Sequence, residues 1–160
     1  MGKERRLNRL HGFNYSSAGY YFVTINVHGR EPVFASAVNG TTGLNVYGCF
    51  AERCWSEIPG HFAGCFTDEY IIMPDHVHGI IIIGENAYNE PSAGKGPQYE
   101  KLPVIIGSYK SAVSKLIHRS GRKDFRWQKS YHDRIIRDQQ ELESIRKYIR
   151  SNPERWLAAR

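Results

Sequence analysis

The segment from Met73 to Ile83, which reads Met-Pro-Asp-His-Val-His-Gly and then four isoleucines, constrains the fold of this chain most. A run this apolar is typical of a central strand that is covered on both faces. Strand side chains alternate between two faces, so His76 and His78 point one way and Val77 points the other. Burying two unpaired imidazoles costs free energy unless hydrogen bonds or a cation satisfy them. The segment therefore predicts a buried strand with either a hydrogen-bonded histidine pair or a metal site.

Length and charge narrow the class of protein. The 160 residues favour a single domain, 1–160, that is long enough to bury a core. Lys and Arg number 22 against 16 Asp and Glu, which leaves a formal net charge of +6. Such an excess favours a polyanionic partner such as nucleic acid. The basic N-terminal arm, 1–18, supplies Arg5, Arg6 and Arg9 as candidates for contacts with DNA phosphates.

Cysteine usage and the absence of apolar targeting segments indicate the compartment. The three cysteines have no C-x-x-C spacing, which argues against a disulfide framework or a zinc cluster. The charged first residues lack the apolar region of a signal peptide, and no segment is long enough to span a bilayer. We therefore expect a cytoplasmic protein that has no membrane contact.

Residue patterns predict the other elements and their order. Strands are expected at 20–28, 66–73, 76–83 and 134–137, with a small hairpin around 33–34 and helices over 44–58, 103–119 and 138–152. Asp138 is expected to cap the last helix, and Pro153 to end it at about Asn152. The stretch 84–102 has the composition of a flexible loop. This βαββαβ order predicts an α+β, ferredoxin-like fold, an antiparallel sheet with helices on one face and a further C-terminal helix.

Two of the predicted helices carry candidate functional side chains. Lys110 and Lys115 lie off the apolar stripe of the 103–119 helix, and form either the wall of a basic groove or an ordinary exposed face. Tyr148 and Asn152 are four residues apart, so they share a face of the last helix. Taken alone, Tyr148 is explained as a core residue and Asn152 as a polar residue at a helix end.

Taken together, these motifs resemble a known enzyme family. Met73–Gly79 fits the histidine–hydrophobe–histidine pattern of HUH enzymes. The blocks 127–128, 131–137 and 145–156 are similar to the C-terminal blocks of single-tyrosine HUH transposases. From about Arg5 to Trp156, the chain resembles the REP-associated tyrosine transposases, relatives of small bacterial insertion-sequence enzymes. The resemblance implies a metal-dependent enzyme that nicks and rejoins single-stranded DNA, at element ends that carry hairpins.

The resemblance also implies roles for individual residues. His76, His78 and Asn152 would be metal ligands, and Tyr148 would be the nucleophile that forms a 5′-phosphotyrosine. The insertion-sequence branch tends to use glutamine where this chain has Asn152. Two imidazoles and one amide oxygen suit Mg²⁺ or Mn²⁺, with positions open for phosphate oxygens. A homodimer is one expected state, because the insertion-sequence branch works as a dimer.

Alternative interpretations concern the nucleophile and the function. Tyr131 is a rival nucleophile, although no matching ligand shares its face, and its neighbours His132 and Asp133 are better placed to orient the site. A non-catalytic nucleic-acid binder with an RRM-like sheet is the main functional alternative, but such a sheet displays aromatic residues where this strand has histidines and isoleucines. A small histidine-based metallohydrolase would account for the metal ligands and leave the excess of positive charge unexplained.

Overall fold

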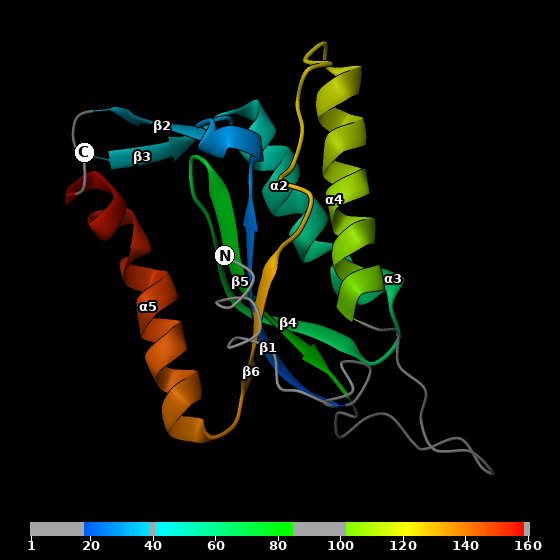
Figure 1. The fold of residues 1–160 in the computed structure, drawn as a ribbon, viewed down its shortest axis with the longest axis vertical. Helices are drawn as coiled ribbons and strands as arrows, with labels where there is room; N and C mark the ends of the chain where they lie inside the picture. Colours follow the sequence, from blue (N-terminus) through cyan, green and yellow to red (C-terminus); the bar gives the residue numbers. More distant parts are fainter. Residues whose placement is uncertain (1–17, 39–40, 85–101, 159–160) are drawn as a thin grey trace.

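The computed structural model describes residues 18–38, 41–84 and 102–158 (Figure 1). Arg5, Arg6 and Arg9 of the N-terminal arm, and most of the 84–102 loop, lie outside the described residues. The elements, in chain order, are β1 Gly19–Asn26, the 3-10 turn η1 His28–Arg30, β2 Ala35–Val38, β3 Thr41–Leu44, α2 Val46–Ser56, α3 Ile58–His61, β4 Cys65–Ile72, β5 His76–Ile83, α4 Leu102–Arg119, β6 His132–Ile136 and α5 Gln139–Ala158.

The main sheet has four antiparallel strands in the order β4-β5-β1-β6. The two central strands are therefore β5, which carries the histidines, and β1, which pairs with both β5 and β6. With a helix between β1 and β4 and another between β5 and β6, this is the ferredoxin-like α+β fold that the sequence predicts. None of the helices in the described part of the chain has the length and apolar character of a membrane span.

The two faces of the sheet are covered by different helices. Figure 1 shows α2 and α4 on one side of the sheet and α5 on the other. On the first face, Val77 and Ile81 of β5 enter the larger core, together with Trp55 of α2. On the second face, Ile80 packs against α5 in a smaller core. The one central strand thus serves both faces, because its side chains alternate between them.

Gly79 is required by the packing of the larger core. A Cβ atom at this position would lie 2.2 Å from Cζ2 of Trp55, whose side chain is fully buried. The indole therefore packs directly on the backbone of β5 at Gly79, the residue that follows His78. A strand interior without a side chain usually marks such a close approach.

Element boundaries near the β2–β3 hairpin differ from the prediction. The hairpin spans 35–44, later than expected, so the first long helix begins at Val46 and Asn45 caps it by accepting from Gly48 N at 3.0 Å. The predicted helix over 44–58 ends early, because α2 ends at Ser56, and Pro59 lies in the first turn of the following short helix α3. Proline is tolerated there because a first-turn N–H has no partner within the helix.

The predicted end of the last helix at Asn152 is wrong. Asp138 caps α5 as expected, since its Oδ1 accepts from Glu141 N at 2.7 Å, but the helix continues through Pro153 to Ala158. An interior proline costs about 3 kcal/mol. Contacts are made beyond the proline: the Arg155 guanidinium lies 4.8 Å from the Tyr148 ring centre, and the end of α5 reaches β3 (Figure 1).

Candidate active site

The two histidines lie side by side on the sheet face that α5 covers. The centres of the His76 and His78 rings are 4.5 Å apart, and the ring planes meet at 74°. Both residues are buried, at 5% and 6% exposure. The shared face predicted from strand alternation is confirmed, as is the central position of the strand.

Each imidazole is held through the same ring atom. His76 Nδ1 lies 2.6 Å from Asp75 Oδ1, and His78 Nδ1 lies 2.9 Å from Thr24 Oγ1. Nε2 is therefore the atom of each ring that is left for a ligand. Metal-binding histidines are commonly oriented in this way, by a carboxylate or another polar group on the second ring nitrogen. The hydrogen-bonded pair and the metal site, alternatives in the sequence, are compatible in the structure.

The protonation of these groups suits a cation. Burial, followed by repulsion from His76 and Arg30, lowers the pKa of His78 to about 3, so the ring is neutral at physiological pH. Burial acts to raise the pKa of Asp75, but the hydrogen bonds from His76 and Arg30 outweigh it and bring that pKa down to about 2. A neutral imidazole is the form that binds metals.

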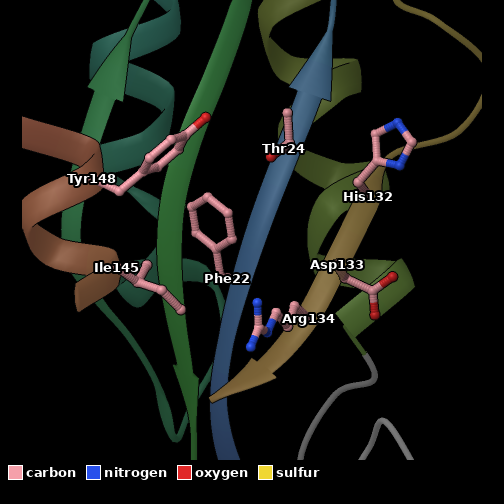
Figure 2. A pocket seen from close by; sticks show the side chains of 7 residues that line it. All are labelled: Phe22, Thr24, His132, Asp133, Arg134, Ile145 and Tyr148. Carbon is pink, nitrogen blue, oxygen red and sulfur yellow. The ribbon is translucent and has the colours of Figure 1, made fainter. Parts of the chain in front are cut away.

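Tyr148 reaches this histidine pair from α5. The centre of its ring is 5.4 Å from that of His78 and 6.1 Å from that of Phe22, which itself stacks on His78. Figure 2 shows the phenol extending from α5 over the sheet toward β5 and β1. The docking of α5 thus brings together residues 70 positions apart in the sequence.

Two amide side chains, Asn26 and Asn152, are buried on β1 and α5. Asn152 lies one turn after Tyr148 on the same helix face and is 6% exposed. Asn26 is the cross-strand partner of His76, and its buried Oδ1 accepts no hydrogen bond in the described part of the chain. Residues 18–38, 41–84 and 102–158 contain no cluster of three His, Cys, Asp or Glu side chains fit for a metal. Asn26 and Asn152 are the buried amides of the described residues that could supply an oxygen ligand.

A pocket of about 330 Å³ opens beside Tyr148 (Figure 2). It is lined by Phe22, Thr24, His132, Asp133, Arg134, Ile145 and Tyr148. Phe22 and Ile145 are apolar lining residues, and Thr24, His132 and Arg134 are polar ones. A ligand that enters the pocket therefore lies directly against the Tyr148 phenol.

Several predicted residues lie away from the histidines. Tyr131, the rival nucleophile, packs against the larger core on the α2 and α4 side. Lys110 and Lys115 belong to α4, on the far face of the sheet, and Lys110 Nζ donates to the carbonyl of Gln128 at 2.8 Å. His132 is exposed on β6 and borders the pocket, while Asp133 is buried.

Sequence reasoning missed two further residues of the histidine network, Arg30 and Asp75. Arg30 Nε donates to Asp75 Oδ2 at 3.1 Å, so Asp75 bridges Arg30 and His76. Asp75 was not among the predicted site residues. Its position before His76 was a usable signal, but the 45 residues between Arg30 and Asp75 left no spacing to recognise.

A relative of similar length shows the family. An uncharacterized protein of Haemophilus influenzae is 33% identical over 161 residues, covering 95% of this chain and 89% of that protein. The chain belongs to the family of this Haemophilus protein. No family model matches the sequence.

Solved structures show the same fold at lower identity. The structure of a REP-associated tyrosine transposase bound to a REP hairpin superposes with a TM-score of 0.62 at 16% identity, over 92% of this chain and 73% of that one. A proposed transposase from Deinococcus radiodurans gives a TM-score of 0.51 at 15% identity, over 89% of this chain and 97% of that one. The family member described here therefore has a transposase-like fold, as its motifs predicted.

Proposed function

We propose that this protein is a metal-dependent enzyme that nicks and rejoins single-stranded DNA, with Tyr148 as the nucleophile. The observation that carries the proposal is the 5.4 Å approach of the Tyr148 ring to His78, beside His76. A phenol that served only packing would not need two buried imidazoles, each held with Nε2 free, next to it.

The residues at the site fit a divalent cation, Mg²⁺ or Mn²⁺. His76 and His78 would bind it through Nε2, and Asn152 through its amide oxygen. The buried Oδ1 of Asn26, next to His76, marks a polar position that a cation or its water would satisfy. When bound, the cation would polarise the scissile phosphate and balance the charge that develops on it.

Tyr148 supplies the covalent chemistry. Its deprotonated oxygen attacks phosphorus, a P–O bond to Tyr148 forms, and the bond to the 3′ oxygen breaks, which releases a 3′-hydroxyl. The 5′-phosphotyrosine conserves the energy of the bond, so a 3′-hydroxyl from another strand reverses the step and joins new ends. The phenol proton of Tyr148 must leave before or during the attack. The pocket beside the Tyr148 phenol would hold the DNA strand.

Charge and fold similarity support DNA as the substrate. The net charge of +6 favours a polyanion, and the REP-associated transposase of the same fold is bound to a REP hairpin. We therefore propose ends that carry hairpins as the natural target. The RRM-like alternative is disfavoured because α5 covers the sheet face that such a module would offer to bases.

The test uses oligonucleotides labelled at the 3′ end, because the covalent product keeps the fragment 3′ of the nick. Purified protein is incubated with Mn²⁺ and single strands from the DNA that flanks its own gene, and adducts are separated under denaturing conditions. The proposal predicts an adduct that requires metal, disappears in Tyr148→Phe and persists in the matched control Tyr131→Phe.

The other outcomes each assign something different. DNA binding without an adduct would favour the non-catalytic binder, and an adduct in Tyr148→Phe would assign another nucleophile. Equal cleavage with and without chelator would remove the metal from the proposal. The expected homodimer stays a prediction, which the molar mass in solution tests.

A further inference from the structure

We propose that Arg30 binds a phosphate of the DNA strand at the edge of the histidine site, with Asp75 holding its guanidinium in place. The inference rests on the proposed function, since it concerns how the same site receives its strand. It assigns a phosphate-binding residue outside the predicted ligands and nucleophile.

The guanidinium is anchored next to the histidines. Arg30 Nε donates to Asp75 Oδ2 at 3.1 Å, while the other oxygen of Asp75 meets His76 Nδ1 at 2.6 Å. Arg30 Nη2 also lies 3.5 Å from His76 Nδ1. Arginine has no acceptor atom, and His76 Nδ1 already points at Asp75, so this approach is proximity rather than a hydrogen bond. The guanidinium therefore lies beside the His76 ring, on the side of Nδ1.

The two side chains of this ion pair differ in their exposure to solvent. The Asp75 side chain is 3% exposed, whereas that of Arg30 is 55% exposed. A guanidinium has five N–H donors, and Asp75 accepts from one nitrogen, so the remaining donors are open toward solvent in the described part of the molecule. Arginine binds phosphate oxygens through such paired donors. A phosphate that enters the site would find them at its edge.

The backbone under Arg30 is held in an unusual conformation. Arg30 has φ 56° and is the only non-glycine residue with positive φ in the described ranges. Such residues concentrate at functional sites, where the surrounding structure maintains them. Here Arg30 N donates to Val27 O at 2.9 Å, and Val27 N donates to Asp75 O at 2.9 Å. The turn that carries Arg30 is therefore hydrogen-bonded to the turn that carries Asp75. These bonds hold the Arg30 guanidinium in place before a strand of DNA binds.

Salt dependence of DNA binding tests this role without requiring cleavage. A phosphate contact on a single strand contributes about 0.7 to the slope of log affinity against log salt concentration. Binding of labelled oligothymidylate is measured with Mn²⁺ in a Tyr148→Phe background. We expect Arg30→Gln to reduce the magnitude of the salt slope by about 0.7. Arg30→Lys should keep most of the slope, because the charge remains. Arg53→Gln, an exposed arginine on α2, is the matched control and should leave the slope unchanged.

The Mn²⁺ affinity of Arg30→Gln is also measured without DNA. This measurement tells a contact between Arg30 and phosphate from a role of Arg30 in supporting His76 alone. The inference is overturned if Arg30→Gln keeps the slope, whether or not its Mn²⁺ affinity falls. Arg30→Gly, in which the left-handed φ is unstrained, repeats the test should the glutamine variant not fold. If the Tyr148→Phe protein itself fails to bind single strands, and wild type forms no adduct, the proposed function fails. If the inference alone is wrong, the wild-type protein still forms the Tyr148 adduct.

Discussion

The two faces of the sheet divide stability and chemistry between them. The face toward α2 and α4 holds the larger core, with Trp55 and Ile81 fully buried. The face toward α5 holds a smaller core around Ile80, and then His76 and His78 with their polar partners. Because β5 contributes to both, residues that are adjacent in the chain should respond very differently to substitution.

The largest expected effect is on the rate of DNA cleavage, at the α5 face. His78→Ala removes a proposed metal ligand, and the several kcal/mol of transition-state stabilisation that a cation supplies correspond to about a thousandfold in rate. The free energy of unfolding should change by only about 1 kcal/mol, because burying the polar imidazole contributes little net stability. Single-turnover adduct formation and urea denaturation measure the two effects. A variant that melts far earlier and cleaves normally once folded would contradict the division.

Ile81→Ala is the matched substitution on the opposite face of the same strand. Ile81 is fully buried in the larger core, so its truncation should lower the free energy of unfolding by about 2–5 kcal/mol. The fraction that stays folded should form the Tyr148 adduct at the wild-type rate. Urea denaturation gives the stability, and a rate lowered by more than a few-fold in the folded fraction would show that the faces are coupled.

An intermediate effect is expected at the support of His76. Asp75→Asn removes the carboxylate that accepts from His76 and Arg30. Loss of such an outer partner typically lowers metal affinity by about 10–100-fold. Isothermal titration with Mn²⁺, compared with wild type, checks this value. Unchanged affinity would mean that Asp75 serves the turn and not the imidazole.

The smallest expected effect concerns the docking of α5 on β4. Arg146 binds Asp68 through two contacts of 2.7 Å. These hydrogen bonds, opposed by burial, lower the pKa of Asp68. The carboxylate therefore stabilises the fold fully above its unfolded pKa of about 3.9, and this contribution is lost as the pH falls through the lowered folded value.

Asp68→Asn should therefore cost about 1 kcal/mol or less at neutral pH and flatten the acid limb of the stability curve. Thermal unfolding between neutral and acidic pH measures this flattening. Arg53, which pairs with Glu57 on the exposed surface of α2, provides the control in Arg53→Gln. Equal acid limbs in wild type and Asp68→Asn would contradict the role of the ion pair.

Local patterns predicted much of this architecture. The isoleucine run and the His-x-His alternation identified β5 and its two faces, because a strand repeats every two residues whatever surrounds it. The cap at Asp138 followed from equally local chemistry. The meeting of Tyr148 with the histidines came from the resemblance of the motifs, since spacing alone does not define how α5 docks.

What the sequence missed depends on contacts between distant segments. Pro153 indicated a helix end by its own backbone chemistry, but the helix continues to Ala158, and α5 contacts β3 there (Figure 1). Arg30 has no periodicity or motif that links it to Asp75, and only the pairing of β1 with β5 brings their turns together. Tertiary packing decided both positions.

The most direct test of the account is a crystal structure with Mn²⁺, using anomalous scattering to locate the ion. The account predicts one strong site bound by Nε2 of His76 and His78 and the Asn152 amide oxygen, with the Tyr148 hydroxyl facing it. Manganese bound elsewhere, or bound by the histidines with Tyr148 and Asn152 turned away, would contradict the central claim.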